Sequence, residues 1–146
     1  MENNNNKLVG KWGGIPITGI KNGEYNKYIY SDDIDIIKDL EQPIVEIIGV
    51  NEEYVIAKSD GYTFRISPII VQESEKPDFF VKDKVKFHNS KGYLEFGIIK
   101  NLYWHTNNNK FIYLIEVNGK LKSRRYFAED LEKDISTYQT FSKSTS

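Results

Sequence analysis

Hydrophobic and polar residues alternate along much of the second half of the chain, and this two-residue period predicts β-strands. The predicted strands cover residues 79–87, 93–103, 111–117 and 120–127. Asn118-Gly119 lies between the last two strands and favours a type I′ hairpin turn, because both of its residues accept a positive φ. Residues 128–131 follow as a single helical turn. The second half is therefore expected to be a β meander.

The first half ends with the same arrangement. An Asp60-Gly61 turn lies between two predicted strands, residues 54–58 and 62–66, and residues 67–71 take the place of the helical turn. The spacing from the start of the strand to the turn glycine is seven residues in both hairpins. This match favours two diverged copies of one small β unit. Two unrelated meanders that share a hairpin are the alternative interpretation.

Residues 32–41 depart from the β pattern. Ser31 is a candidate N-cap, acidic residues follow it, and apolar residues recur at every third position from Ile34 to Leu40. Pro43 would end such a helix. A short helix is the favoured interpretation, and a strand that buries alternate residues is the competing one.

A polar segment that contains Pro77 separates the two blocks and predicts a linker. The expected organisation is a flexible N-terminus (1–10), a first β unit (11–72), the linker (73–78), a second β unit (79–135) and a flexible tail (136–146). The predicted core consists of Ile47, Ile56, Phe64, Ile69, Val85, Phe87, Ile98, Leu114, Val117, Phe127 and Leu131.

The second unit carries a short family-like pattern. Val85-Lys86-Phe87 is followed by a turn at residues 89–92 and then by Gly97-Ile98-Ile99. This order resembles the KOW-type segments of SH3-like small barrels, the group that also contains Tudor modules, and the resemblance spans residues 79–134. It departs from the family at Lys82, where a leading glycine is usual. For residues 79–134 the resemblance implies an SH3-like small barrel. Together with the strand pattern and the repeated hairpin, it leads us to expect a mainly β protein of two tandem SH3-like small β-barrel units. In general character the chain also resembles small bacterial immunity proteins, which bind toxins.

The composition excludes several kinds of chemistry. The 146 residues include no cysteine and two histidines, so disulfide scaffolds, thiolate metal sites and multi-histidine sites are ruled out. No common catalytic or phosphate-binding motif occurs, and Gly13-Gly14 is interpreted as a tight turn. His88 and His105 lack a sequence-adjacent nucleophile, and structural or surface roles are favoured for both. We therefore expect no enzyme, no cofactor and no metal. With no signal-peptide pattern, a cytoplasmic protein is expected.

The net charge of −1 hides an uneven distribution of charge. Residues 1–75 carry a net charge of −6, and residues 76–135 carry +4. Asp32, Asp33 and Asp35 have a spacing that could bind Mg²⁺ or Ca²⁺, but the glycine and the glutamate of an EF-hand loop are missing. A role beside a helix N-terminus is the favoured interpretation. The acidic first block would also attract a basic protein partner.

The basic residues of the return strand form the richest candidate site. On a regular strand the side chains of Lys120, Lys122, Arg124 and Tyr126 would share one face, and Tyr103, Trp104 and Tyr113 would extend it as an aromatic platform. Such a surface could contact phosphates and stack a nucleic-acid base. Lysines also protect edge strands from unwanted pairing.

The favoured function is that of a non-catalytic protein-binding protein, an immunity-type protein or a regulatory adaptor. An RNA-binding small-barrel module that uses residues 120–126 is the alternative.

Overall fold

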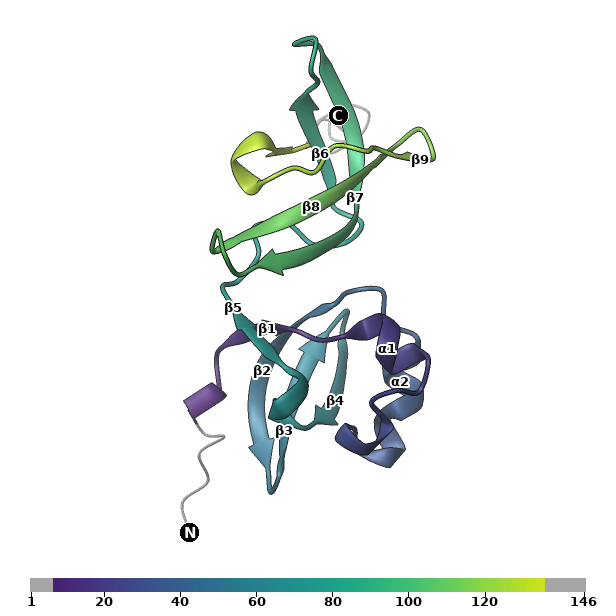
Figure 1. The fold of residues 1–146 in the computed structure, drawn as a ribbon, viewed down its shortest axis with the longest axis vertical. Helices are drawn as coiled ribbons and strands as arrows, with labels where there is room; N and C mark the ends of the chain where they lie inside the picture. The colour runs from purple at the N-terminus through teal and green to yellow at the C-terminus, as the bar shows by residue number, and fades with distance from the viewer. Residues whose placement is uncertain (1–6, 136–146) are drawn as a thin grey trace, which may run out of the picture. The chain divides into compact units, whose positions relative to one another are not determined.

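The computed structural model describes residues 7–135 and divides the chain at Lys76 and Pro77 into two compact units. Each unit contains one five-stranded antiparallel sheet, so the mainly β prediction is confirmed (Figure 1). The division falls within the segment predicted as a linker, residues 73–78. Part of that segment is nevertheless a strand, because β5 (Gln72–Ser74) pairs with β1 (Trp12–Gly14).

Unit 1 is a meander whose last strand returns to its first. The sheet order is β4-β3-β2-β1-β5. The remaining strands of this sheet are β2 (Ile44–Asn51), β3 (Tyr54–Ser59) and β4 (Tyr62–Ile66). The register between β2 and β3 shifts at a bulge between Ile47 and Gly49. Asp60 and Gly61 both have positive φ angles, 53° and 80°, in the predicted hairpin turn.

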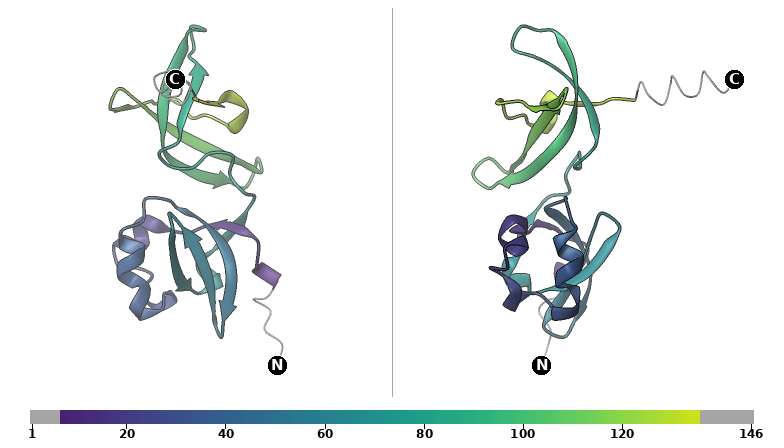
Figure 2. Two further views of the ribbon diagram at one scale, coloured as in Figure 1. Left: turned by 180° about the vertical axis from the view of Figure 1, so that it is seen from behind. Right: turned by 90° about the vertical axis from the view of Figure 1, so that its right-hand side faces the viewer.

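A helical segment between β1 and β2 covers the inner side of this sheet (Figure 2). It consists of α1 (Ile17–Lys21), η2 (Asn26–Tyr28), η3 (Ser31–Asp33) and α2 (Ile34–Lys38). Its buried side chains, among them Ile20, Ile37 and Leu40, pack with those of β2, β3 and β4. The helix predicted near residues 32–41 is present as α2. α1 was not predicted, since Pro16 and Gly19 mask its pattern.

Unit 2 repeats the sheet order without the helical insertion. Its order is β10-β6-β7-β8-β9. The strands are β6 (Lys84–His88), β7 (Leu94–His105), β8 (Lys110–Val117), β9 (Lys120–Leu121) and β10 (Glu132–Lys133). The register between β7 and β8 shifts between Ile99 and Asn101. The predicted hairpin turn is confirmed, with φ angles of 52° at Asn118 and 79° at Gly119.

The two sheets share several features. In each, the last strand lies beside the first, the second strand contains a bulge, and the third and fourth strands are joined by a two-residue turn with positive φ. A 3₁₀ turn precedes the last strand in both units, η4 (Pro68–Ile70) and η5 (Ala128–Asp130). Both sheets are open: among residues 7–135, no strand pairing closes either one into a barrel.

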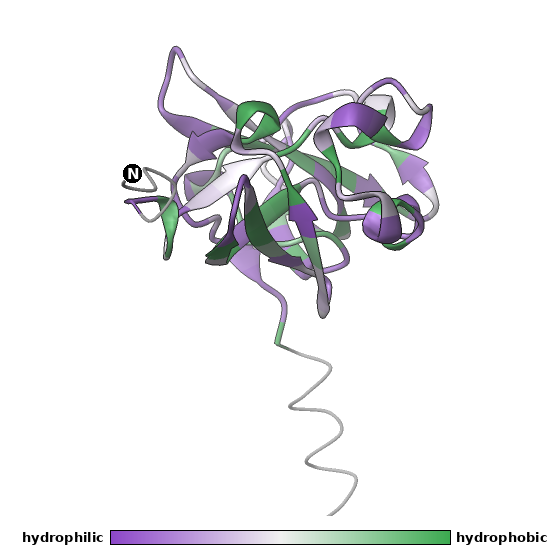
Figure 3. Ribbon diagram, turned by 90° about the horizontal axis from the view of Figure 1, so that it is seen from below, coloured by the Kyte–Doolittle hydropathy of each residue, from purple (hydrophilic) through white to green (hydrophobic). Residues whose placement is uncertain are grey.

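Each unit has its own buried side chains, and its strands carry both hydrophobic and hydrophilic residues (Figure 3). Of the predicted core, the side chains of Ile47, Phe64, Val85, Phe87 and Leu131 are buried. Those of Ile56, Leu114, Val117 and Phe127 are half-buried. The prediction is wrong for Ile69 and Ile98, which are 75% and 41% exposed.

The prediction of a tight turn at Gly13-Gly14 is also wrong. Gly13 lies in β1, and a Cβ at this position would meet Val71 Cγ1 at 2.5 Å and the Gln72 carbonyl oxygen at 2.8 Å. The glycine therefore permits the close approach of β5 to β1.

The two ends of the chain are only partly described. Of the N-terminal segment predicted as flexible, Leu8 packs against the core of unit 1, and the Gly10 amide donates a 2.7 Å hydrogen bond to the Ile47 carbonyl. The predicted flexible tail, residues 136–146, lies outside the described residues. None of the helices in residues 7–135 combines the length and the apolar character that crossing a membrane requires.

Candidate functional site

The basic return strand is regular only as far as Lys122. Lys120 and Leu121 pair with β8, and the Lys122 amide donates a 2.8 Å hydrogen bond to the Ile115 carbonyl. The next bridge joins Tyr126 to Tyr113. Three residues, 123–125, therefore lie opposite the single residue Leu114 and bulge out of the ladder. Lys120, Lys122 and Tyr126 are opposite Val117, Ile115 and Tyr113, which alternate along β8, so these three members of the predicted set share one face of the sheet. That face is the buried one, since Ile115 and Tyr113 are core residues.

Two of the predicted platform tyrosines are core residues. The Tyr126 side chain is 2% exposed, its ring lies 4.7 Å from that of Phe87, and burial raises its pKa. Tyr113 is fully buried, and its hydroxyl accepts hydrogen bonds from the amides of Asp78 and Phe79 at 3.2 and 3.4 Å. Burial raises the pKa of Tyr113 to about 12. Neither ring is free to stack on a ligand.

The other two aromatic residues of the predicted platform are half-buried. Tyr103 and Trp104 lie near the end of β7, and the Trp104 ring packs edge-on against Phe111 at 4.9 Å. Of the predicted platform, the Tyr113 ring is therefore unavailable, and Tyr103 and Trp104 are partly exposed.

The cations near this strand differ in their partners. Lys122 Nζ lies 3.4 and 3.3 Å from the two carboxylate oxygens of Glu95, so its charge is already paired. Among the described residues, neither Lys120 nor Arg125 has an ion pair or a side-chain hydrogen bond. The Arg124 guanidinium lies 4.9 Å from the centre of the Tyr126 ring and has no carboxylate partner in this part of the chain. Three unpaired cations thus lie at or just after β9.

The acidic triplet of unit 1 is divided between two roles. Asp33 is buried and accepts three hydrogen bonds from Arg65: from the backbone amide at 2.8 Å, from Nε at 2.9 Å and from Nη2 at 3.2 Å. The hydrogen bond from the Arg65 side chain lowers the pKa of Asp33. Asp33 therefore ties the helical segment to β4, whereas Asp32 and Asp35 are exposed. Within residues 7–135, no cluster of three or more potential ligands could hold a metal ion.

The two histidines lie at strand ends. His88 is exposed at the end of β6, and His105 is half-buried at the end of β7. His105 Nδ1 is buried and has no hydrogen-bond partner among the described residues. In a Ser-His-Asp triad, the histidine Nδ1 donates a hydrogen bond to the carboxylate, and His105 has no such contact among the described residues.

A surface that the sequence did not predict lies on the outer side of the unit 2 sheet. We define this apolar face by four side chains of β7 and β9, which are 49%, 51%, 41% and 56% exposed: Leu94, Phe96, Ile98 and Leu121. Residues that are directly opposite in an antiparallel sheet share a face. Ile98 is opposite Glu116, and Glu116 is opposite Leu121, so the two strands contribute to one surface.

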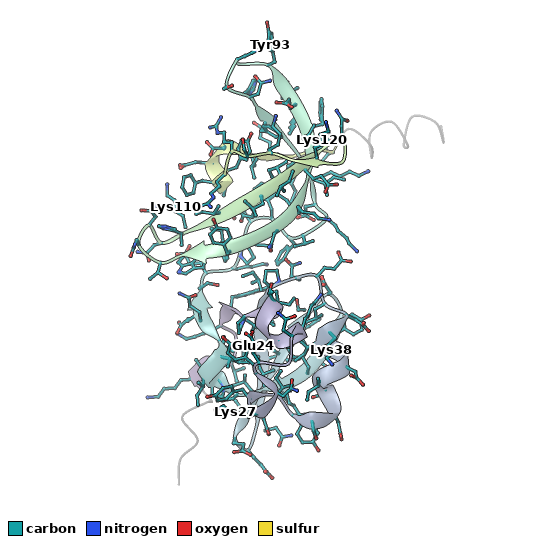
Figure 4. The ribbon with its side chains drawn as sticks, turned by 45° about the vertical axis from the view of Figure 1, so that its right-hand side comes forward. Glu24, Lys27, Lys38, Tyr93, Lys110 and Lys120 are labelled. Atoms are coloured by element: carbon teal, nitrogen blue, oxygen red, sulfur yellow. The ribbon has the colours of Figure 1, made fainter. Side chains whose placement is uncertain are left out.

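Charged and polar side chains of β6 border the apolar face. His88, Lys86 and Lys84 are opposite Leu94, Phe96 and Ile98 respectively. Lys86 Nζ lies 3.7 Å from a carboxylate oxygen of Glu132 on β10. Tyr93, which is 68% exposed, lies at the tip of the β6–β7 hairpin, where its side chain extends away from the sheet (Figure 4).

The corresponding row in unit 1 is more polar. There the cross-strand neighbours are Trp12, Glu46, Lys58 and Thr63, and in unit 2 they are Lys84, Ile98, Glu116 and Leu121. In each row, the residue on the second strand lies one position before the bulge. The residue on the fourth strand lies two positions after the glycine of the hairpin turn. Since the same sheet order accepts glutamate and threonine in the places of Ile98 and Leu121, the fold does not require apolar residues there.

The pattern of residues 94–99 explains why this face was not predicted. Leu94, Phe96 and Ile98 alternate with Glu95, Gly97 and Ile99, so the apolar residues that suggest a buried face are the exposed ones. The inner face is filled by Val85, Phe87 and Ile99. Leu121, the fourth residue of the apolar face, belongs to the return strand, for which the sequence predicted a binding surface made of its basic residues.

Comparison with known proteins places residues 6–132 within the model of a family of unknown function (DUF6960). None of the curated proteins matches the chain.

Proposed function

The chain belongs to the DUF6960 family, whose description assigns no activity, and we propose that it is a non-catalytic protein-binding module that uses the apolar face of unit 2. The observation that carries this proposal is the exposure of Leu94, Phe96, Ile98 and Leu121 on one side of one sheet. Adaptors and immunity-type proteins act through contacts of this kind, without turnover.

The anatomy of the face supports protein binding. Interfaces place apolar and aromatic side chains at the centre and charged side chains at the rim. Here Phe96 lies between Leu94 and Ile98 on β7, and Lys84, Lys86 and His88 lie beside them on β6. Each of the four apolar side chains is already about half-buried, so covering it would contribute on the order of 1 kcal/mol.

The strand order supports a related proposal about the fold. In SH3-like small barrels a meander is completed by a last strand beside the first, preceded by a one-turn helix. Both sheets of this chain have that order and a 3₁₀ turn in that place. We therefore propose that the chain is a tandem pair of SH3-like units, with a helical insertion in the first.

The contact proposed here differs from the one that the charge distribution suggested. The sequence favoured a basic partner on the acidic first block, where Asp32 and Asp35 are exposed. The apolar side chains that an interface needs are grouped on unit 2 instead. For the RNA-binding alternative, Lys122 is neutralised by Glu95, and Tyr113 and Tyr126 are buried, which weakens the case for base stacking.

The experiment compares partner recovery between matched variants. The tagged full-length chain, its Phe96→Ser/Leu121→Ser variant and an Ile48→Ser/Ile69→Ser control would be expressed in the native host, and co-purifying proteins quantified by mass spectrometry. The control removes two exposed apolar side chains of unit 1, which are 44% and 75% exposed. We expect one or more proteins whose recovery falls at least about tenfold with the unit 2 variant only. Equal recovery with all three would contradict the proposal.

A titration tests the RNA-binding alternative directly. Fluorescence anisotropy with single-stranded and duplex oligonucleotides at two salt concentrations would compare the wild type with Arg124→Glu/Arg125→Glu. We expect no saturable binding to either form. Binding that weakens steeply with salt and disappears in the variant would replace protein binding with nucleic-acid binding, because counterion release and phosphate contacts both depend on these arginines.

A further inference from the structure

We propose that the apolar face of unit 2 binds the same face of a second copy of the chain, about a two-fold axis that runs along β7. This inference rests on the protein-binding function proposed above and names the partner. It follows from the opposite charges that lie on the two sides of β7.

The two residues that flank Ile98 on the outer side of the sheet have opposite charges. Lys84 on β6 and Glu116 on β8 are both directly opposite Ile98, so the three side chains form one row. Lys84 is exposed and has no ion pair among the residues that the structure describes. Glu116 lies 3.8 Å from Lys100, whose side chain is 63% exposed, and an exposed pair of this kind contributes little. Both charges are therefore available to a partner that covers β7.

A two-fold axis along β7 makes this face complementary to itself. β7 then packs on β7 of the second copy, and the apolar residues Leu94, Phe96 and Ile98 cover their own counterparts. Because β6 and β8 are both one strand away from β7, the axis places β6 of one copy over β8 of the other. Lys84 then faces Glu116 of the second copy, and the symmetry forms this contact twice. Packed sheets lie about 10 Å apart, a gap that extended lysine and glutamate side chains span together.

Other arrangements match the charges less well. An acidic partner would pair with Lys84 but repel Glu116, and a basic partner would do the reverse. A two-fold axis that crosses β7 at Phe96 would bring Lys86 against its own counterpart, since Lys86 is directly opposite Phe96. A second copy about the axis along β7 covers the apolar residues and pairs both charges.

Sedimentation equilibrium of the full chain, over a wide range of concentrations, tests the proposal. The variants are Phe96→Ser, Lys84→Glu and Glu116→Lys. Ile48→Ser removes an exposed apolar side chain of unit 1, and Lys58→Glu reverses an exposed charge of unit 1, so these two are the matched controls. Circular dichroism and thermal unfolding of every variant verify that it is folded.

We expect the wild type and both controls to dimerise, and Phe96→Ser to weaken the dimer at least about tenfold. Lys84→Glu and Glu116→Lys each place like charges together in their own dimers, so each should also weaken self-association at least about tenfold. An equimolar mixture of these two variants should associate about as tightly as the wild type, because both contacts of the mixed dimer again join a cation to an anion.

The two proposals fail in different ways. A monomeric wild type would overturn the second copy, and protein binding would stand if recovery of a different protein from the native host still depended on Phe96 and Leu121. If no recovered protein depended on them either, both proposals would be overturned. A dimer that survives Phe96→Ser, or charge variants that fail to associate when mixed, would overturn the arrangement about β7.

Discussion

The Asp33 side chain attaches the helical segment of unit 1 to β4. It is buried, and both of its carboxylate oxygens accept hydrogen bonds from Arg65, whose guanidinium stacks on the Tyr30 ring at 3.8 Å. The sequence placed Asp33 on an acidic surface with its neighbours Asp32 and Asp35. Local pattern could not separate the three, because the partner that distinguishes Asp33 lies 32 residues away.

Asp33→Asn is expected to destabilise the protein at neutral pH by on the order of 2 kcal/mol, since hydrogen bonds to a charged group are lost. Arg65 lowers the folded-state pKa of Asp33 below its ordinary value of 3.8. The stabilisation is therefore present above pH 3.8 and is lost as the pH falls through the folded-state value. Urea midpoints at pH 7 and pH 2.5 would measure this, and the gap between the wild type and the variant should narrow at the lower pH. A gap of constant size would contradict the ionic role of Asp33.

At the scale of single elements, β7 packs tightly against β8 at Gly97. A Cβ there would meet Ile115 Cγ2 at 2.5 Å and the Glu116 carbonyl oxygen at 2.9 Å. Backbone cannot move aside as a flexible side chain can, so Gly97→Ala should destabilise unit 2 by about 2 kcal/mol. Gly49→Ala is the matched control in β2, where the nearest atom, Ile56 Cδ1, lies at 3.4 Å. Thermal unfolding of both variants checks the prediction, and equal losses would contradict it.

Sequence pattern predicted the elements that local residues determine. The hairpin at Asn118-Gly119 and the short helix α2 follow from turn chemistry and from apolar spacing within a few residues. The bulge at residues 123–125 does not, because it is defined by which residues of β8 pair with Lys122 and Tyr126. The assignment of Ile98 to the core failed for a related reason: alternation identifies two faces of a strand but not which face is covered.

At the scale of the whole molecule, charge and apolar exposure are divided between the two units. Unit 1 carries a net charge of −5 and unit 2 a net charge of +4, and the apolar face belongs to unit 2. The contacts of Asp33 lie within unit 1, and those of Tyr113 and Tyr126 lie within unit 2. Each unit therefore has its own network of stabilising interactions, which predicts that they unfold as separate cooperative units.

Two tryptophans make this prediction measurable, since Trp12 belongs to unit 1 and Trp104 to unit 2. In a Trp104→Phe background, fluorescence reports unit 1, and in a Trp12→Phe background it reports unit 2. Adding Asp33→Asn to each background should lower the urea midpoint seen by Trp12 and leave that seen by Trp104 unchanged, because the lost hydrogen bonds stabilise unit 1 alone. Gly97→Ala should do the reverse. If either substitution shifted both midpoints equally, the chain would unfold as one cooperative unit, and binding at the unit 2 face would depend on the stability of unit 1 as well.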